Sequence, residues 1–180
     1  APLNIRKCID LDLPVVCGTT GWNEKIPETE SYCRAQGGSL FHASNFSLGV
    51  NILFSLNRKL ARIMDQFPEY KVHIHETHHV HKKDAPSGTA ISLAEGIIAH
   101  SDYKAWTLGR EEAGSIPIVS ERTGDIPGTH RIAYESEVDR IEIEHTAHSR
   151  EGFAQGALLA AEWLVGKKGV FGMKDVLNLR

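Results

Sequence analysis

Two short apolar strands on either side of one helix are the feature that most constrains the fold of this chain. Val15–Cys17 is a continuously apolar run, which is typical of a strand buried on both faces. Residues 27–35 are expected to be helical with a proline in the first turn, Gly37-Gly38 ends that helix, and residues 40–43 form a second short strand. A strand, a helix and a strand within about 30 residues predict a parallel α/β sheet.

The sheet predicted for this first part is small. A short helix around residues 5–9 precedes it, and a long helix with an apolar stripe from Leu53 to Met64 follows it. Only two strands are predicted between those helices, and two strands do not form a stable open sheet alone. Residue 1 is Ala and not Met. We therefore expect the chain to be a piece of a longer protein, with further strands preceding Ala1.

The middle of the chain has a different pattern. Apolar and polar residues alternate over residues 70–75, which predicts a half-buried strand, and a loop over residues 76–88 leads into a further helix. Residues 107–147 have a β pattern with a hairpin turn at residues 135–139. A last amphipathic helix covers residues 153–164. The change from a parallel to a hairpin pattern predicts two domains of different architecture.

The overall composition excludes several classes of protein. The chain has 20 Lys and Arg against 23 Asp and Glu, a net charge of −3, so no basic surplus suggests a nucleic-acid partner. No apolar run approaches the roughly 20 residues of a membrane span, and no signal-peptide pattern is visible. The three cysteines at positions 8, 17 and 33 form no Cys-x-x-Cys pair. We expect a cytoplasmic enzyme with neither a nucleic-acid nor a membrane partner.

Five of the ten histidines fall at positions 73, 75, 78, 79 and 81. A metal site is the first hypothesis to test, because His73 and His75 share one face of a strand and imidazole is a good zinc ligand. Lys82 and Lys83 argue against it, since a cation site does not normally surround itself with positive charge. We therefore expect no metal, and a metal-dependent hydrolase is kept as a less favoured alternative.

The segment Asp84-Ala-Pro-Ser-Gly-Thr89 leads into the start of a helix. Free N–H groups and the helix dipole at such an end bind carboxylate or phosphate oxygens. Gly88 lets the backbone approach closely, and the hydroxyls of Ser87 and Thr89 add donors. An N-cap explains Ser87 alone, but it does not explain the His-His-x-x-Lys cluster at residues 78–82. The pattern predicts a small-anion site with a histidine and a lysine placed for proton transfer.

Residues 76–90, which read ETHHVHKKDAPSGTA, closely resemble the signature of the dihydrodipicolinate reductase family of bacterial and plant lysine biosynthesis. Residues 18–21 look like the family's nicotinamide-side turn, and residues 43–51 look like the crossing into its substrate domain. Residues 149–157 resemble the return to the nucleotide domain. The resemblance covers nearly the whole chain.

The resemblance implies roles for individual residues. His78 is the proton donor or acceptor, and Lys82 is a second proton donor beside the ring nitrogen of the substrate. The substrate-binding residues it implies are His79, Ser87, Gly88, Thr89 and Thr20. The cofactor-binding residues it implies are Gly18, Thr19, Thr20, Ala43, Ser44, Asn45, Phe46 and Arg150.

The fold and reaction implied are those of an NAD(P)H-dependent oxidoreductase that reduces 4-hydroxy-tetrahydrodipicolinate to tetrahydrodipicolinate in lysine and diaminopimelate biosynthesis. We expect an α/β fold. Residues 1–46 and 151–180 are the remnant of an incomplete Rossmann-like nucleotide-binding domain, and residues 47–150 are an α+β substrate and tetramerisation domain with a mixed sheet. The expected ligands and partners are NADH or NADPH, a small dicarboxylate substrate and three further copies of the chain.

The sequence departs from the family pattern at two places. It contains no G-x-G-x-x-G turn for the cofactor pyrophosphate, so the choice between NADH and NADPH is unreadable, and the region 109–132 looks shorter than in longer members. We expect this chain as it stands to be weakly active or inactive. A non-catalytic, oligomerising fragment of the same enzyme is therefore the main alternative.

Overall fold

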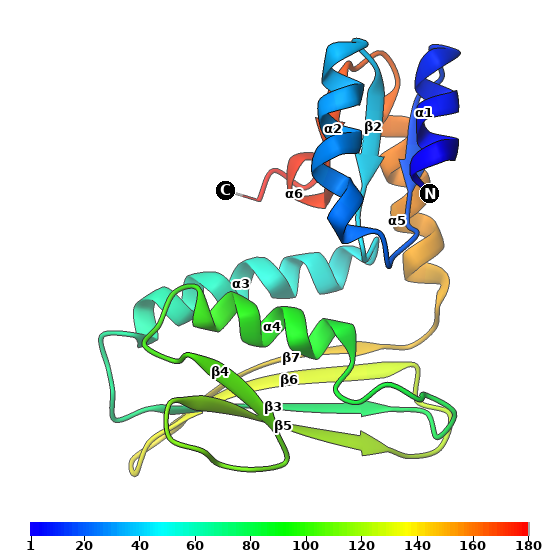
Figure 1. The fold of residues 1–180 in the computed structure, drawn as a ribbon. Helices are drawn as coiled ribbons and strands as arrows, with labels where there is room; N and C mark the ends of the chain where they lie inside the picture. Colours follow the sequence, from blue (N-terminus) through cyan, green and yellow to red (C-terminus); the bar gives the residue numbers. More distant parts are fainter. Residues whose placement is uncertain (180) are drawn as a thin grey trace. The chain divides into compact units, whose positions relative to one another are not determined.

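The computed structural model describes residues 1–179, which form two compact units (Figure 1). The first unit comprises Ala1–Asn51 together with the chain from Glu151 onward, and the second comprises Ile52–Arg150. The units divide between residues 51 and 52, whereas the sequence placed a boundary between 46 and 47. No described helix is long and apolar enough to cross a membrane.

The first unit is built on a three-stranded parallel sheet in the order β1-β2-β8. Its strands are β1 (Val15–Cys17), β2 (Ser39–His42) and β8 (Gly169–Phe171). Its helices are α1 (Pro2–Asp10), a 3-10 helix (Asn23–Lys25), α2 (Ile26–Ala35), α5 (Glu151–Leu164) and α6 (Met173–Val176).

The two strands predicted before the long helix are confirmed, whereas the third strand, β8, was not predicted. The three residues of β8 pair in parallel with β2, which makes β2 the central strand. A stretch of three residues is too short to show a periodicity of two, so the pattern of the sequence could not reveal it. The sheet therefore includes a strand from a distant part of the chain.

Both faces of this parallel sheet are covered, as parallel sheets require. Leu40 of β2 packs with Ile5 and Ile9 of α1 and with Cys33 of α2. Phe41, the next residue, points to the opposite face, where it packs against residues of α5 and α6. Helix α5 contacts both β1 and β2.

The second unit contains a five-stranded mixed sheet in the order β4-β5-β3-β6-β7. Its strands are β3 (Lys71–His78), β4 (Ala105–Leu108), β5 (Ser115–Arg122), β6 (Gly128–Glu135) and β7 (Arg140–Ala147). Strand β3 is parallel to β5 and antiparallel to β6, and β6 and β7 form the predicted hairpin. Helices α3 (Leu48–Met64) and α4 (Gly88–Ile98) lie on one face of the sheet (Figure 1). The predicted α/β fold with a mixed sheet is confirmed.

Strand β3 is longer than its sequence pattern suggested. Alternate residues Val72, Ile74, Glu76 and His78 are buried on the helix-covered face. The predicted strand ended at His75, and the prediction of a loop beginning at Glu76 was wrong. The cause is chemical: two polar residues occupy buried positions at which a hydrophobic pattern would require apolar ones. Buried polar side chains need partners, and those partners define the candidate site.

Candidate active site

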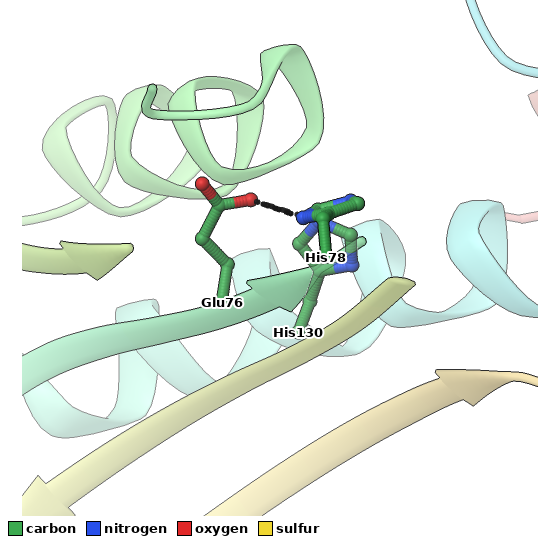
Figure 2. A group of neighbouring side chains, drawn as sticks. All are labelled: Glu76, His78 and His130. Atoms are coloured by element: carbon green, nitrogen blue, oxygen red, sulfur yellow. Dashed lines mark ion pairs between the residues drawn. The ribbon is translucent and has the colours of Figure 1, made fainter. Parts of the chain in front are cut away.

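His78 lies at the end of β3, almost completely buried, beside a second buried polar residue of the same strand. Residues two apart in a strand point to the same face, so the side chains of Glu76 and His78 are neighbours. The Nδ1 atom of His78 lies 2.8 Å from Oε2 of Glu76 (Figure 2). Gly128 adjoins the other ring nitrogen, since a Cβ added to it would lie 2.9 Å from Nε2.

Glu76 has no solvent-exposed surface and is held by a set of donors from three elements. Its Oε1 accepts hydrogen bonds from the backbone N–H of Ser87 and from Nη2 of Arg122, each at 3.0 Å. Burial alone would raise the pKa of Glu76, but the hydrogen bonds from His78, Ser87 and Arg122 hold it well below its ordinary value. The carboxylate is therefore ionised, and Arg122 balances its charge.

His130 of β6 completes this cluster from the neighbouring strand. Its Nε2 lies 3.1 Å from the hydroxyl of Ser87 and 3.8 Å from Oε2 of Glu76, and its ring centroid is 5.0 Å from that of His78 (Figure 2). Burial, and next the nearby His78, lower the pKa of His130 to about 4. His130 is therefore neutral at physiological pH.

Mildly acidic pH is expected to destabilise the fold through His130. Its pKa falls from 6.5 to about 4 on folding, so between these values the unfolded chain binds a proton that the folded chain does not. The free energy of unfolding is therefore highest above pH 6.5. It falls by about 3 kcal/mol in all as the pH is lowered towards 4. Urea denaturation across this range measures it. In His130→Gln, whose amide can still bond Ser87, the pH dependence of the free energy of unfolding should become weaker by the contribution of His130, and an unchanged slope would contradict the assignment.

Glu76, His78 and His130 also place three potential metal-ligand atoms within 4.8 Å of one another. Two features argue against a cation there. The Arg122 guanidinium already bonds the carboxylate, and Nδ1 of His78 lies 2.8 Å from that same carboxylate. Histidines 73 and 75, from which the metal hypothesis began, lie on the opposite face of β3, away from this trio. We interpret the trio as a buried polar cluster.

Helix α4 begins beside the cluster, as the anion-site motif predicted. Ser87 is its N-cap, and its hydroxyl accepts a hydrogen bond from the backbone N–H of Ala90 at 3.2 Å. Among the hydrogen bonds described for residues 1–179, none engages the backbone N–H of Gly88 or Thr89. Gly88 is exposed and has open space where a side chain would be. Two donors at a helix N-terminus are therefore available to an anion.

Lys82 and His79 lie in the turn that follows β3. The backbone N–H of Lys82 donates to the carbonyl of His79 at 3.1 Å, which folds the turn. The ammonium of Lys82 donates to both carboxylate oxygens of Asp84, at 2.8 and 2.7 Å. Nη2 of Arg150 lies 3.3 Å from Nε2 of His79, and slight burial together with this cation lowers the pKa of His79.

The residues predicted to line the cofactor fall mostly in the first unit. Residues 18–20 follow β1 and residues 43–46 follow β2, so both segments lie at the carboxyl edge of the parallel sheet. Ligands of open α/β sheets bind at this edge. A Cβ on Gly18 would come 3.1 Å from the ring of Phe46, so the two segments are in contact. The ring of Phe46 itself is buried in the core, stacked against Phe41. Arg150 belongs to the second unit.

Comparison with known proteins decides the family. A profile described as "Dihydrodipicolinate reductase, C-terminus" matches residues 49–177. A 4-hydroxy-tetrahydrodipicolinate reductase of Christiangramia forsetii is 49% identical over 176 residues, which are 97% of this chain and 74% of that relative. The chain belongs to the dihydrodipicolinate reductase family.

Further relatives agree with this assignment. A 4-hydroxy-tetrahydrodipicolinate reductase of Neisseria meningitidis serogroup C is 36% identical over 98% of this chain and 68% of its own length. A solved dipicolinate-bound dihydrodipicolinate reductase from Paenisporosarcina sp. TG-14 shares the fold, with a TM-score of 0.74 and 22% identity over 97% of this chain and 70% of that one.

Three residues of the cluster had no role in the sequence-based prediction. Glu76 lies inside the dihydrodipicolinate reductase motif. Had residues 76–78 been assigned to a strand, the spacing of two would have placed Glu76 and His78 on the same face. Arg122 and His130 reach the site only through strand pairing, because β5 and β6 flank β3 on either side. No local sequence signal indicates such a contact.

Proposed function

We propose that this protein acts on 4-hydroxy-tetrahydrodipicolinate, which it reduces with NADH or NADPH to tetrahydrodipicolinate in lysine and diaminopimelate biosynthesis. The observation that carries the proposal is the free helix N-terminus at Gly88 and Thr89, which starts beside the buried cluster of His78 and follows the turn of Lys82. An anion site next to two proton-transfer groups suits a dicarboxylate that must be protonated. The names of the relatives and the dipicolinate in the similar structure support this substrate class.

The roles of the residues follow from their chemistry. The backbone N–H groups of Gly88 and Thr89, with the side chains of Ser87, Thr89 and His79, bind the substrate carboxylates. Lys82 protonates the ring nitrogen or holds its developing charge, and His78 exchanges a second proton. Thr20 is a further substrate-binding residue in this assignment.

The nicotinamide end of the cofactor fits residues 18–20 and 43–46, because these segments meet at the carboxyl edge of a parallel sheet. Arg150 is a further candidate contact. When bound, NADH or NADPH supplies the hydride. In this assignment the first unit belongs to the nucleotide-binding domain and the second is the substrate domain.

The protein is expected to bind pyridine-2,6-dicarboxylate but to have little or no reductase activity as the 180-residue chain. The helix N-terminus is a local structure, whereas the sequence has no glycine-rich turn for the cofactor pyrophosphate. Loss of remote binding energy lowers catalysis as well as affinity. Calorimetric titration with the dicarboxylate and with NADH, together with a turnover assay, measures both properties.

Pyridine-3,5-dicarboxylate is the matched control ligand, because it has the same charge but a different placement of its carboxylates. It should bind far more weakly than the 2,6-isomer. Equal affinity for the two isomers would show that the site binds anions without specificity for the 2,6-dicarboxylate. Tight NADH binding with rapid turnover would contradict the expected weak activity.

A homotetramer is expected to form through the second unit. Its helices cover one face of the sheet, while the opposite face carries a charged ladder in which Arg131 pairs with Glu142 and Glu144. Strands β4 and β7 are sheet edges, which natural proteins usually cover. Light scattering at micromolar concentration should give about four times the 19.9 kDa of one chain, and a monomer would refute the assembly.

A further inference from the structure

We propose that Glu76 is a positioning residue that fixes the tautomer of His78, with the proton of the neutral ring on Nδ1 and a free lone pair on Nε2. The inference rests on the proposed function in taking His78 as a proton-transfer group. It adds Glu76, which acts on the reaction only through its effect on His78. The contacts of the two carboxylate oxygens of Glu76 support this assignment.

Nδ1 of His78 has one available partner. It lies 2.8 Å from Oε2 of Glu76, and both atoms are shielded from solvent. Within residues 1–179 no hydrogen bond of conventional geometry engages either atom, so this 2.8 Å contact is the polar contact that remains for Nδ1. An ionised carboxylate can only accept a hydrogen bond, so the proton between the two atoms belongs to Nδ1.

The carboxylate cannot turn away from this arrangement. Its Oε1 is already occupied by the backbone N–H of Ser87 and by Nη2 of Arg122. Arg122 also donates to the backbone carbonyl of Asp84 at 2.7 Å, which ties the strand to the loop that carries Lys82. Oε2 is therefore the oxygen that remains for His78.

The ring of His78 is confined as well. His130 stands against it edge-to-face, with an interplanar angle of 73° (Figure 2). Nε2 is directed at Gly128, where the absence of a side chain leaves room beside the nitrogen. With Nδ1 committed to Glu76, a proton given up by or accepted from the substrate passes through Nε2, while the Nδ1–H bond stays intact. Carboxylates that orient a catalytic imidazole act in this way.

The substitution Glu76→Gln should invert the tautomer. Oε1 faces two donors, so the amide carbonyl of the glutamine must take that place and its NH₂ group must face Nδ1. Nδ1 then accepts a hydrogen bond, and the proton of the neutral ring moves to Nε2. A residue that only supports the fold would not produce this change.

Long-range ¹H–¹⁵N spectra of histidine-labelled full chain, recorded at alkaline pH, distinguish the protonated from the unprotonated ring nitrogen. The signals of His78 are assigned with the variant His78→Asn. We expect Nδ1–H in the wild-type protein and Nε2–H in Glu76→Gln. The control is Glu30→Gln, which removes a carboxylate 2.8 Å from another imidazole, that of His42, and should leave the tautomer of His78 unchanged.

A wild-type His78 protonated on Nε2 would overturn the proposal even if Glu76→Gln failed to fold, and so would an unchanged tautomer in the folded variant. In a form of the protein that turns over, Glu76→Gln should lower kcat by about 10²–10⁴-fold, as loss of a general acid or base does, with a smaller change in KM. These spectra need neither substrate nor cofactor. Failure to bind pyridine-2,6-dicarboxylate would therefore refute the proposed function and leave the tautomer assignment standing.

Discussion

Lys82→Ala is expected to lower turnover by about 10²–10⁴-fold, the usual cost of losing one general acid, while Lys83→Ala should have little effect. The two residues are neighbours with the same charge, but their surroundings differ. The ammonium of Lys82 is held by both oxygens of Asp84, in the turn between the His78 cluster and the start of α4. Lys83 is exposed. Position and not net charge therefore distinguishes them.

Steady-state kinetics of both variants, in a form of the protein that turns over, test this prediction, and each variant is the control for the other. Lys82→Arg separates charge from proton transfer, because guanidinium keeps the positive charge but does not release a proton in proteins. It should retain dicarboxylate affinity without restoring kcat. Equal losses in Lys82→Ala and Lys83→Ala would show that the active lysine has been assigned wrongly.

The part of the site that could be predicted from the sequence is the part that is local along the chain. The proposed anion site depends on Ser87 capping the helix that begins at Gly88, and a capping residue followed by a helical pattern is readable without a structure. The α/β fold was predictable for a similar reason, since the parallel strands β1 and β2 of one sheet and the β6–β7 hairpin of the other have characteristic local patterns. Local chemistry and local periodicity sufficed in both cases.

The rest depends on contacts between segments far apart in the sequence. Arg122 reaches Glu76 across the pairing of β5 with β3, and His130 reaches it from β6 on the other side. Strand β8 was missed because it has only three residues and pairs with a strand far away in the sequence. Glu76 was assigned to a loop because a buried charged residue breaks the hydrophobic pattern of its strand. The failure of the pattern and the candidate active site coincide, which is expected where polar chemistry is placed inside a core.

Gly156→Ala is expected to be the most damaging single-methyl substitution in the first unit. A Cβ at this position of α5 would lie 1.8 Å from the backbone oxygen of Phe46 and 2.8 Å from its carbonyl carbon. Backbone atoms cannot move aside as the end of a flexible side chain can. The helix must therefore shift off the sheet that it covers, or the segment after β2 must move.

The cost should be about 3 kcal/mol or more, the upper range for overpacking a well-packed site. It exceeds the gain of about 1 kcal/mol that alanine brings over glycine inside a helix. Because Phe46 belongs to the predicted cofactor segment, NADH affinity should fall along with stability. The matched control is Gly152→Ala in the same helix, where the nearest atom to an added Cβ, the hydroxyl of Ser47, is 3.9 Å away. Urea denaturation followed by circular dichroism should show Gly152→Ala unchanged or slightly stabilised. If Gly156→Ala were equally stable, the close packing of α5 against the segment after β2 would be refuted.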